Sequence, residues 1–158
     1  MKYFIDTEFI EKPGSIQLIS IGIKCEDGGE YYAVSSEFNP EDANQWVKDN
    51  VLKKINNKNA KTIPLIRDEI LKFVKGKNIQ FYGYYADYDW VVFCWIFGTM
   101  IELPKGFPMY CRDLKQMMDE KGLDNNWKKI NCPDPESEHH ALVDANWNYN
   151  LFKKIINS

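Results

Sequence analysis

The first 36 residues contain three segments with the composition of β-strands, and this start limits the fold more than any other feature of the chain. Residues 2–9 are largely apolar and contain two acids, and residues 15–24 are rich in isoleucine. Residues 30–36 follow the turn sequence Asp27-Gly28-Gly29, which suits an antiparallel connection because these residue types tolerate a positive φ. The sequence therefore predicts an antiparallel start to a sheet.

Helical and strand-like segments alternate in the remainder of the chain. The predicted helices cover residues 40–55, 62–74, 88–97, 113–121 and 142–156, and the predicted strands cover residues 79–85 and 109–112. Residues 122–136 are polar and contain prolines, which is typical of a mobile loop. Strands first and alternating elements afterwards indicate an α/β fold, with helices packed on a mixed sheet.

Length and composition exclude several classes of protein. A chain of 158 residues is long enough for one domain with its own core, taken here as residues 1–158, and 44% hydrophobic residues exclude a disordered protein. The longest apolar run, Trp90–Phe97, is far too short to cross a membrane. Four cysteines without a CxxC pair favour neither a zinc site nor a disulfide framework, so we expect a reduced, cytoplasmic setting.

The charge of the chain limits its partners. The formal net charge of −3 provides no basic excess for holding long duplex DNA, because phosphate neutralisation supplies most non-specific affinity. A nucleic acid held at one end, through metal ions and a few stacked bases, is compatible with this charge. Short or single-stranded ends are therefore favoured over duplex.

The first strand carries two acids in an otherwise apolar segment. Asp6 and Glu8 are two residues apart in an extended chain, so both point to the same face of the sheet with Cβ atoms roughly 7 Å apart. Two unpaired carboxylates in a buried strand must bind cations or take up protons. The alternative is an acidic pair at a wetted strand end.

Two later segments carry further candidates for the same site. Asp89 lies at the mouth of the most apolar segment, where it serves as a ligand or as a helix cap, with Asp87 as a competing candidate. Asp144 begins the last helix beside an apolar stripe formed by Leu142, Ala145, Tyr149, Phe152 and Ile156. His139 and His140 precede it, and either histidine near a carboxylate cluster is a ready general base at neutral pH.

The order of these motifs resembles the DEDDh family of 3′→5′ exonucleases. That family has Asp-x-Glu in its first strand, an acid after a later strand, and His-x-x-x-x-Asp at its last helix. The matching segments here are DTEF at residues 6–9, YYADYDW at 84–90 and HHALVDA at 139–145. Matched residue by residue, the resemblance assigns the general base to His139 and the metal-binding acids to Asp6, Glu8, Asp89 and Asp144. Tyr85 departs from the pattern, because many relatives have Asn or His before the alanine of the second motif.

The resemblance covers almost the whole chain and is nearest to small bacterial or phage exoribonucleases of the RNase T type. It implies an RNase H-like fold, with three antiparallel strands followed by parallel ones. It also implies a two-metal exoribonuclease that uses Mg²⁺ or Mn²⁺ and releases nucleoside 5′-monophosphates from single-stranded RNA (or DNA) 3′ ends. Thr7, Phe9 and Tyr88 are the expected contacts to the terminal nucleotide, and a homodimer is compatible with the resemblance.

Three other functions remain open from the sequence. The chain could be a single-stranded DNA exonuclease of the proofreading kind, which digestion of matched RNA and DNA strands distinguishes. A non-catalytic protein that binds nucleic-acid ends would have at least one broken position in the motif set, whereas all five are present here. A generic acidic α/β binding domain would show no shared Mn²⁺ site in a titration.

Overall fold

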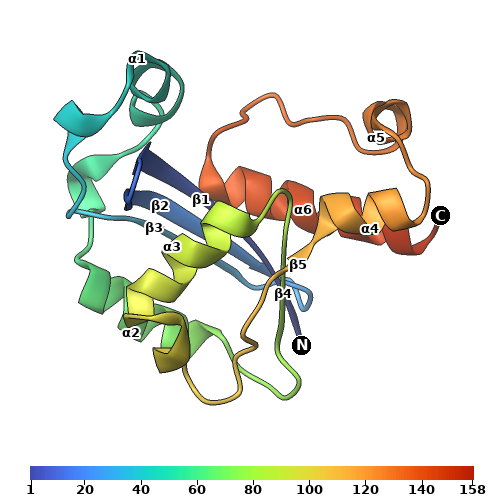
Figure 1. Cartoon of the computed structure of the whole chain (residues 1–158), viewed down its shortest axis with the longest axis horizontal. Coiled ribbons are helices and arrows are strands. Elements are labelled where there is room, and N and C mark those ends of the chain that lie inside the picture. The colour runs from blue at the N-terminus through green and yellow to red at the C-terminus, as the bar shows by residue number, and fades with distance from the viewer.

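Five strands form one mixed sheet in the order β3-β2-β1-β4-β5 (Figure 1). The computed structural model describes residues 1–158, and the strands are β1 (Lys2–Lys12), β2 (Ser15–Cys25), β3 (Glu30–Val34), β4 (Gln80–Gly83) and β5 (Arg112–Asp113). Strands β1, β2 and β3 pair in antiparallel fashion, whereas β4 is parallel to β1 and β5 is parallel to β4. The predicted mixed sheet, three antiparallel strands followed by parallel ones, is confirmed.

Helices cover both faces of this sheet. They are α1 (Gln45–Val47), α2 (Ile63–Phe73), α3 (Asp87–Phe97), α4 (Leu114–Glu120), α5 (Asn125–Asn131) and α6 (Ala141–Ile156). Figure 1 shows α6 running along one face, with α4 beside it, while α2 and α3 lie on the other face. None of these helices is long and apolar enough to cross a membrane.

The side chains of β1 alternate between two hydrophobic cores, as the pleat of a strand requires. Phe4 packs with Tyr82 and with the α6 side chain Phe152, at ring-centroid distances of 5.3 and 5.2 Å. Tyr3 and Ile5 point the other way, into the core beneath α2 and α3. Asp6 and Glu8 continue the Phe4 series, so they point toward the α6 side of the sheet.

Strand β4 is short, and this leaves one edge of β1 open. β4 pairs with β1 only from Lys2 to Phe4, and the chain then turns into α3. Tyr85 makes this turn with a φ of 53°, in the left-handed region that few side chains adopt. Beyond Phe4, the edge of β1 therefore faces the first turn of α3 instead of another strand.

The predicted helix over residues 40–55 is wrong as a single element. The chain forms a 3₁₀ turn (Pro40–Asp42), the short α1 and a π-helical turn (Lys48–Leu52). The side chains of Asn39 and Asn44 each accept a backbone hydrogen bond and begin a new turn, so the helix is restarted rather than continued.

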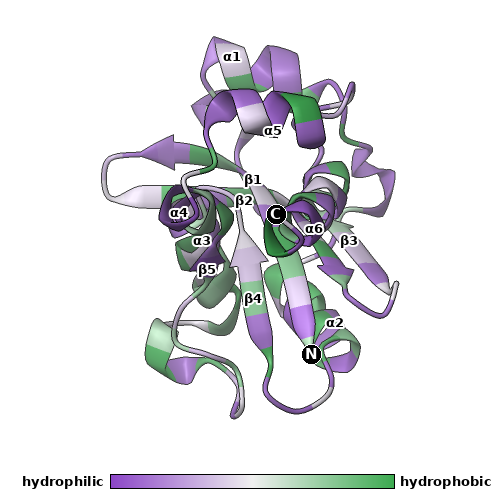
Figure 2. Cartoon of the chain, turned by 90° about the vertical axis from the view of Figure 1, so that its right-hand side faces the viewer, coloured by the Kyte–Doolittle hydropathy of each residue, from purple (hydrophilic) through white to green (hydrophobic).

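The predicted mobile loop over residues 122–136 contains helix α5. Asp124 accepts a hydrogen bond from the Trp127 backbone N–H at 2.7 Å and caps the helix start. Figure 2 shows that α5 is mostly hydrophilic, which explains why no apolar period reveals it.

Smaller corrections concern helix and strand boundaries. Thr62 makes no side-chain capping bond, and the Ile63 N–H donates to the Glu37 carboxylate at 2.9 Å. The last strand begins at Arg112 and is only two residues long. The predicted apolar stripe on α6 is only partly correct. Of its residues, Ala145 and Phe152 are buried, and the buried face also contains Ala141, Asn148, Leu151 and Ile155. Ile156 is exposed.

Candidate active site

Close packing of α6 against β2 brings the separate acids together. Gly22 pairs with Asp6 across the sheet, and a Cβ atom placed on Gly22 would lie only 2.2 Å from the Ala141 carbonyl oxygen. The start of α6 therefore lies directly over the acids of β1. Asp6, Glu8 and Asp144 each present one carboxylate oxygen, and these oxygens lie within 4.8 Å of one another.

Asp144 also holds the segment that precedes α6. Its Oδ2 atom accepts hydrogen bonds from the His139 and His140 backbone N–H groups, at 2.8 and 3.1 Å. His139 has a φ of 64°, so its backbone is held in the left-handed region by these contacts. One carboxylate thus fixes both the start of the helix and the position of the adjacent histidine.

Burial and mutual repulsion make the three acids difficult to ionise together. Burial, together with the charges of Asp89, Glu8 and Asp144, raises the pKa of Asp6 well above its ordinary value. Burial and the charges of Asp144 and Asp89 raise the pKa of Glu8 to about 8, and the charge of Lys54 offsets only part of this. Burial also raises the pKa of Asp144, although the two backbone hydrogen bonds act in the opposite direction. The cluster therefore lacks the positive charge that would balance three ionised carboxylates.

Asp89 approaches from α3, at the open edge of β1. Its Oδ1 atom accepts hydrogen bonds from the Thr7 backbone N–H at 2.7 Å and from the Thr7 hydroxyl at 2.6 Å. Burial raises the pKa of Asp89 to about 6, against the lowering effect of these bonds. Asp89 does not join the three oxygens that lie within 4.8 Å, yet its charge acts on both Asp6 and Glu8. The helix cap is Ala86, and Asp87 is exposed.

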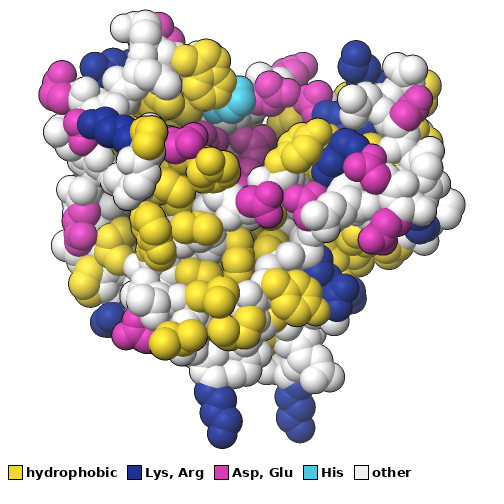
Figure 3. All heavy atoms as spheres, viewed as in Figure 1, with side chains coloured by type: hydrophobic (Ala, Val, Ile, Leu, Met, Phe, Trp, Pro, Cys, Tyr) yellow, Lys and Arg dark blue, Asp and Glu magenta, His cyan; other side chains and the backbone are white.

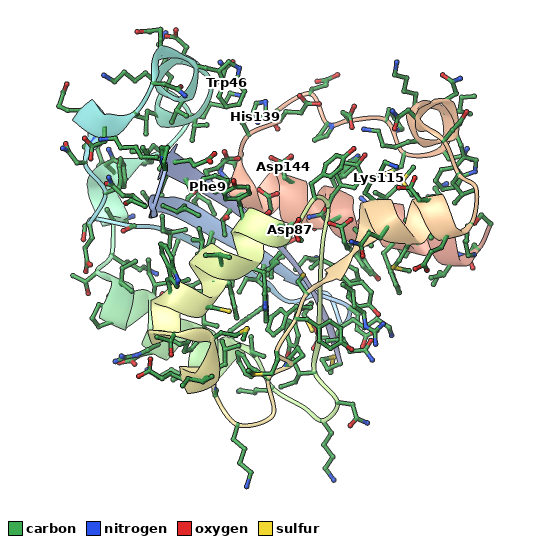
Figure 4. All side chains as sticks on the ribbon, in the orientation of Figure 1. Phe9, Trp46, Asp87, Lys115, His139 and Asp144 are labelled. Carbon is green, nitrogen blue, oxygen red and sulfur yellow. The ribbon has the colours of Figure 1, made fainter.

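The two histidines have different surroundings. The His139 ring meets the Trp46 ring edge-on at 4.7 Å, and Figure 4 shows both above Asp144 at the start of α6. The His140 ring is stacked on Tyr32 at 4.5 Å, and its Nδ1 atom is buried without a hydrogen-bond partner. His139 lines the cavity beside the acids, and His140 does not.

This cavity has a volume of about 320 Å³ and connects the acidic cluster to α5 and α6. Its ten lining residues are Asp6, Tyr84, Lys128, Asp134, Pro135, Glu138, His139, Asp144, Trp147 and Asn148. Figure 3 shows a hollow with acidic side chains inside it, a histidine at its upper edge and hydrophobic side chains on both sides. The sequence alone did not reveal Trp46, Lys128 or Trp147 as neighbours of the site.

The predicted nucleotide contacts have mixed surroundings. The Phe9 ring is stacked on the Tyr88 ring at 5.8 Å, and Figure 4 shows Phe9 on the opposite side of the hollow from α4. Tyr88 is 47% exposed, so it can meet a ligand. Thr7 is buried, and its hydroxyl already donates to Asp89. Of the three predicted contacts, the Phe9–Tyr88 pair therefore remains the candidate for stacking on a base.

The donor set suits a hard divalent cation. Carboxylate oxygens are the ligands preferred by Mg²⁺ and Mn²⁺, whereas zinc in proteins usually takes nitrogen or sulfur ligands as well. Asp6, Glu8 and Asp144 provide such oxygens close together, at a place where positive charge is lacking. The residues present therefore fit a metal site built from acids.

Comparison with known proteins identifies the family. A model of the 3′-5′ exoribonuclease Rv2179c-like domain matches residues 1–156. This chain belongs to that family. It is 38% identical over 161 residues to the 3′-5′ exoribonucleases Rv2179c and MT2234.1 from two strains of Mycobacterium tuberculosis, covering 98% of this chain and 93% of each relative. The prediction of a 3′→5′ exoribonuclease is confirmed by this membership.

A solved structure supports the fold. The zinc-ion-bound form of the E. coli ExoI–ssDNA complex matches 99% of this chain with a TM-score of 0.67 and 13% sequence identity. The chain spans 40% of the length of that protein. The predicted RNase H-like fold is therefore confirmed.

Proposed function

We propose that this exoribonuclease removes nucleoside 5′-monophosphates from single-stranded RNA 3′ ends, with two divalent cations, Mg²⁺ or Mn²⁺, held by Asp6, Glu8, Asp89 and Asp144. The observation that carries the proposal is the cluster of carboxylate oxygens from Asp6, Glu8 and Asp144, within 4.8 Å of one another. Its raised pKa values favour cation binding, because bound cations would supply the missing positive charge.

The residues around the cluster have separate tasks in this proposal. Bound divalent cations would supply an activated water and stabilise charge on the scissile phosphate. The His139 ring, held beside the cavity by Trp46 and by the Asp144 contact to its backbone, accepts the proton of the attacking water. Thr7 positions Asp89 through its two hydrogen bonds. The Phe9 and Tyr88 rings stack on the terminal base.

The test is digestion of 5′-labelled RNA and DNA strands of the same sequence with Mg²⁺ or Mn²⁺. We expect stepwise shortening of the RNA from its 3′ end and release of nucleoside 5′-monophosphates. Faster digestion of the DNA strand would make the chain a DNA exonuclease instead. The similarity to a protein solved with single-stranded DNA is the reason for including that strand.

Asp6→Asn tests the metal cluster directly. The amide keeps the shape of the side chain but removes one charge, so we expect loss of hydrolysis with the unfolding temperature retained or raised. Activity equal to that of the unchanged protein would exclude Asp6 as a metal ligand. A surface carboxylate outside the site, Glu41, provides the control substitution Glu41→Gln, which should leave the rate unchanged.

A further inference from the structure

Lys128 is the one positively charged residue among the ten that line the cavity beside the acidic cluster. Four carboxylates line the same space, from Asp6, Asp134, Glu138 and Asp144. An RNA strand carries one negative charge per phosphate, so these acids oppose its entry. Metal ions would offset the charge at the cluster but not along the rest of the cavity wall. A further cation is needed there, and Lys128 has the right charge and place.

The ammonium group of Lys128 is held by three contacts. Its Nζ atom lies 2.6 Å from the Asp134 carboxylate and over the rings of Tyr84 and Trp147, at 5.4 and 5.1 Å from their centroids. The Lys128 side chain is only 12% exposed. Trp147 is itself fixed, because its indole N–H donates to the Pro133 carbonyl at 2.9 Å. Aromatic faces attract a cation without neutralising it.

Asp134 is the more exposed member of the ion pair. Its side chain is 41% exposed, and it lies in the segment between α5 and α6, outside any helix or strand. It can therefore exchange for another anion without disturbing the packing of Lys128 on the two rings. A phosphate oxygen is an equivalent partner for an ammonium group, which acts on phosphate as a point charge.

We propose that Lys128 binds a phosphate of the RNA strand within this cavity, and that Asp134 is its partner when the cavity is empty of RNA. The inference rests on the proposed function and adds a contact to the phosphate backbone of the substrate. Because the contact is to a phosphate, it increases affinity for any base sequence.

The test compares Lys128→Met with Lys129→Met on the same helix. Lys129 is exposed and does not line the cavity, so its substitution removes the same charge from the same helix but not from the cavity wall. We expect Lys128→Met to raise KM for a short RNA about tenfold or more with a smaller change in kcat, and to lower the salt dependence of binding by about one phosphate contact. Lys129→Met should leave KM within about twofold of that of the unchanged protein. Lys128→Arg keeps the positive charge and should retain most of the affinity.

Asp134→Asn separates phosphate binding from a purely structural role. It removes the competing charge and leaves Lys128 in place, so we expect KM to be unchanged or lower. If Asp134→Asn weakens RNA binding as much as Lys128→Met, the ion pair only supports the fold and the inference is wrong. If Lys128→Met does not fold, a clear rise in KM of folded Asp134→Asn relative to the unchanged protein would still contradict the inference.

The same assays distinguish the two proposals. If the unchanged protein does not shorten RNA, the proposed function fails. If it shortens RNA while Lys128→Met and Lys129→Met behave alike, only the role of Lys128 fails.

Discussion

At the scale of single residues, the backbone conformation next to Asp144 determines which histidine ring reaches the candidate site. Asp144 accepts the N–H groups of both His139 and His140, yet only the His139 ring reaches the cavity. The left-handed φ of His139 turns its ring toward Trp46, while His140 turns back onto Tyr32. Two adjacent histidines therefore have different consequences when they are changed.

We predict that His139→Ala lowers kcat by about 10²–10⁴, in line with the loss of a general base, and changes the unfolding temperature little. His140→Ala should instead lower the unfolding temperature, because its ring packs on Tyr32, with kcat within about tenfold of the unchanged protein. Single-turnover rates and thermal melts of both variants provide the measurement. A larger rate loss in His140→Ala would reverse the assignment.

Several residues of the candidate site could be singled out from the sequence because their signals are local. Asp6 and Glu8 lie two residues apart in a strand, and His139 and Asp144 lie at one helix start. Trp46 and Lys128 could not be predicted in the same way. They belong to α1 and α5, two short helices that have no apolar period, and their role near the site depends on tertiary packing.

At the scale of elements, the contact between β2 and α6 decides where the acids meet. The three initial strands, the turn between β2 and β3 and the buried α3 follow from composition and turn residues. The close approach of Gly22 to Ala141 does not, since a glycine in a strand gives no sign of which helix lies on it. The antiparallel start and the mixed sheet were therefore predictable from these signals, and the packing that assembles the candidate site was not.

We predict that Gly22→Ala destabilises the protein by about 1–3 kcal/mol or more, because the added methyl group would overlap the backbone of α6. Moving α6 would also displace Asp144 from Asp6 and Glu8, so activity should fall more than stability alone explains. Chemical denaturation and RNA digestion of the same sample measure the two effects. Gly29→Ala is the control, because its methyl group would meet only side-chain atoms at 3.2 Å or more. Equal effects of the two substitutions would contradict the assigned role of Gly22.

At the scale of the whole molecule, the acidic cluster makes the stability of the metal-free protein depend on pH. A carboxylate with a raised pKa in the folded state stabilises the fold when protonated, and this contribution is lost as pH rises through the folded pKa. Burial raises the pKa of Glu8 to about 8 and that of Asp89 to about 6, above ordinary values of 4.5 and 3.8. The destabilisation therefore accumulates from about pH 4 to about pH 8.

We predict that, with a chelator present, the unfolding temperature falls between pH 5 and pH 8.5. Mn²⁺ should raise it more at pH 8.5 than at pH 5, because bound cations replace the missing protons. Glu8→Gln removes one titrating group and should flatten the pH dependence. An unfolding temperature in chelator that stays constant across this range would contradict a strained acidic cluster.

The short length of β4 has a consequence for how this protein could be redesigned or could change in evolution. If β4 continued past Gly83 alongside β1, main-chain carbonyls of the longer strand would compete for the Thr7 N–H that now binds Asp89. Helix α3 would then begin later and carry Asp89 away from Asp6 and Glu8. An insertion that completes the hydrogen-bond ladder would extend the sheet and separate Asp89 from the acidic cluster. In this chain, the unpaired edge of β1 is what leaves the Thr7 N–H free to bind Asp89 beside the acidic cluster.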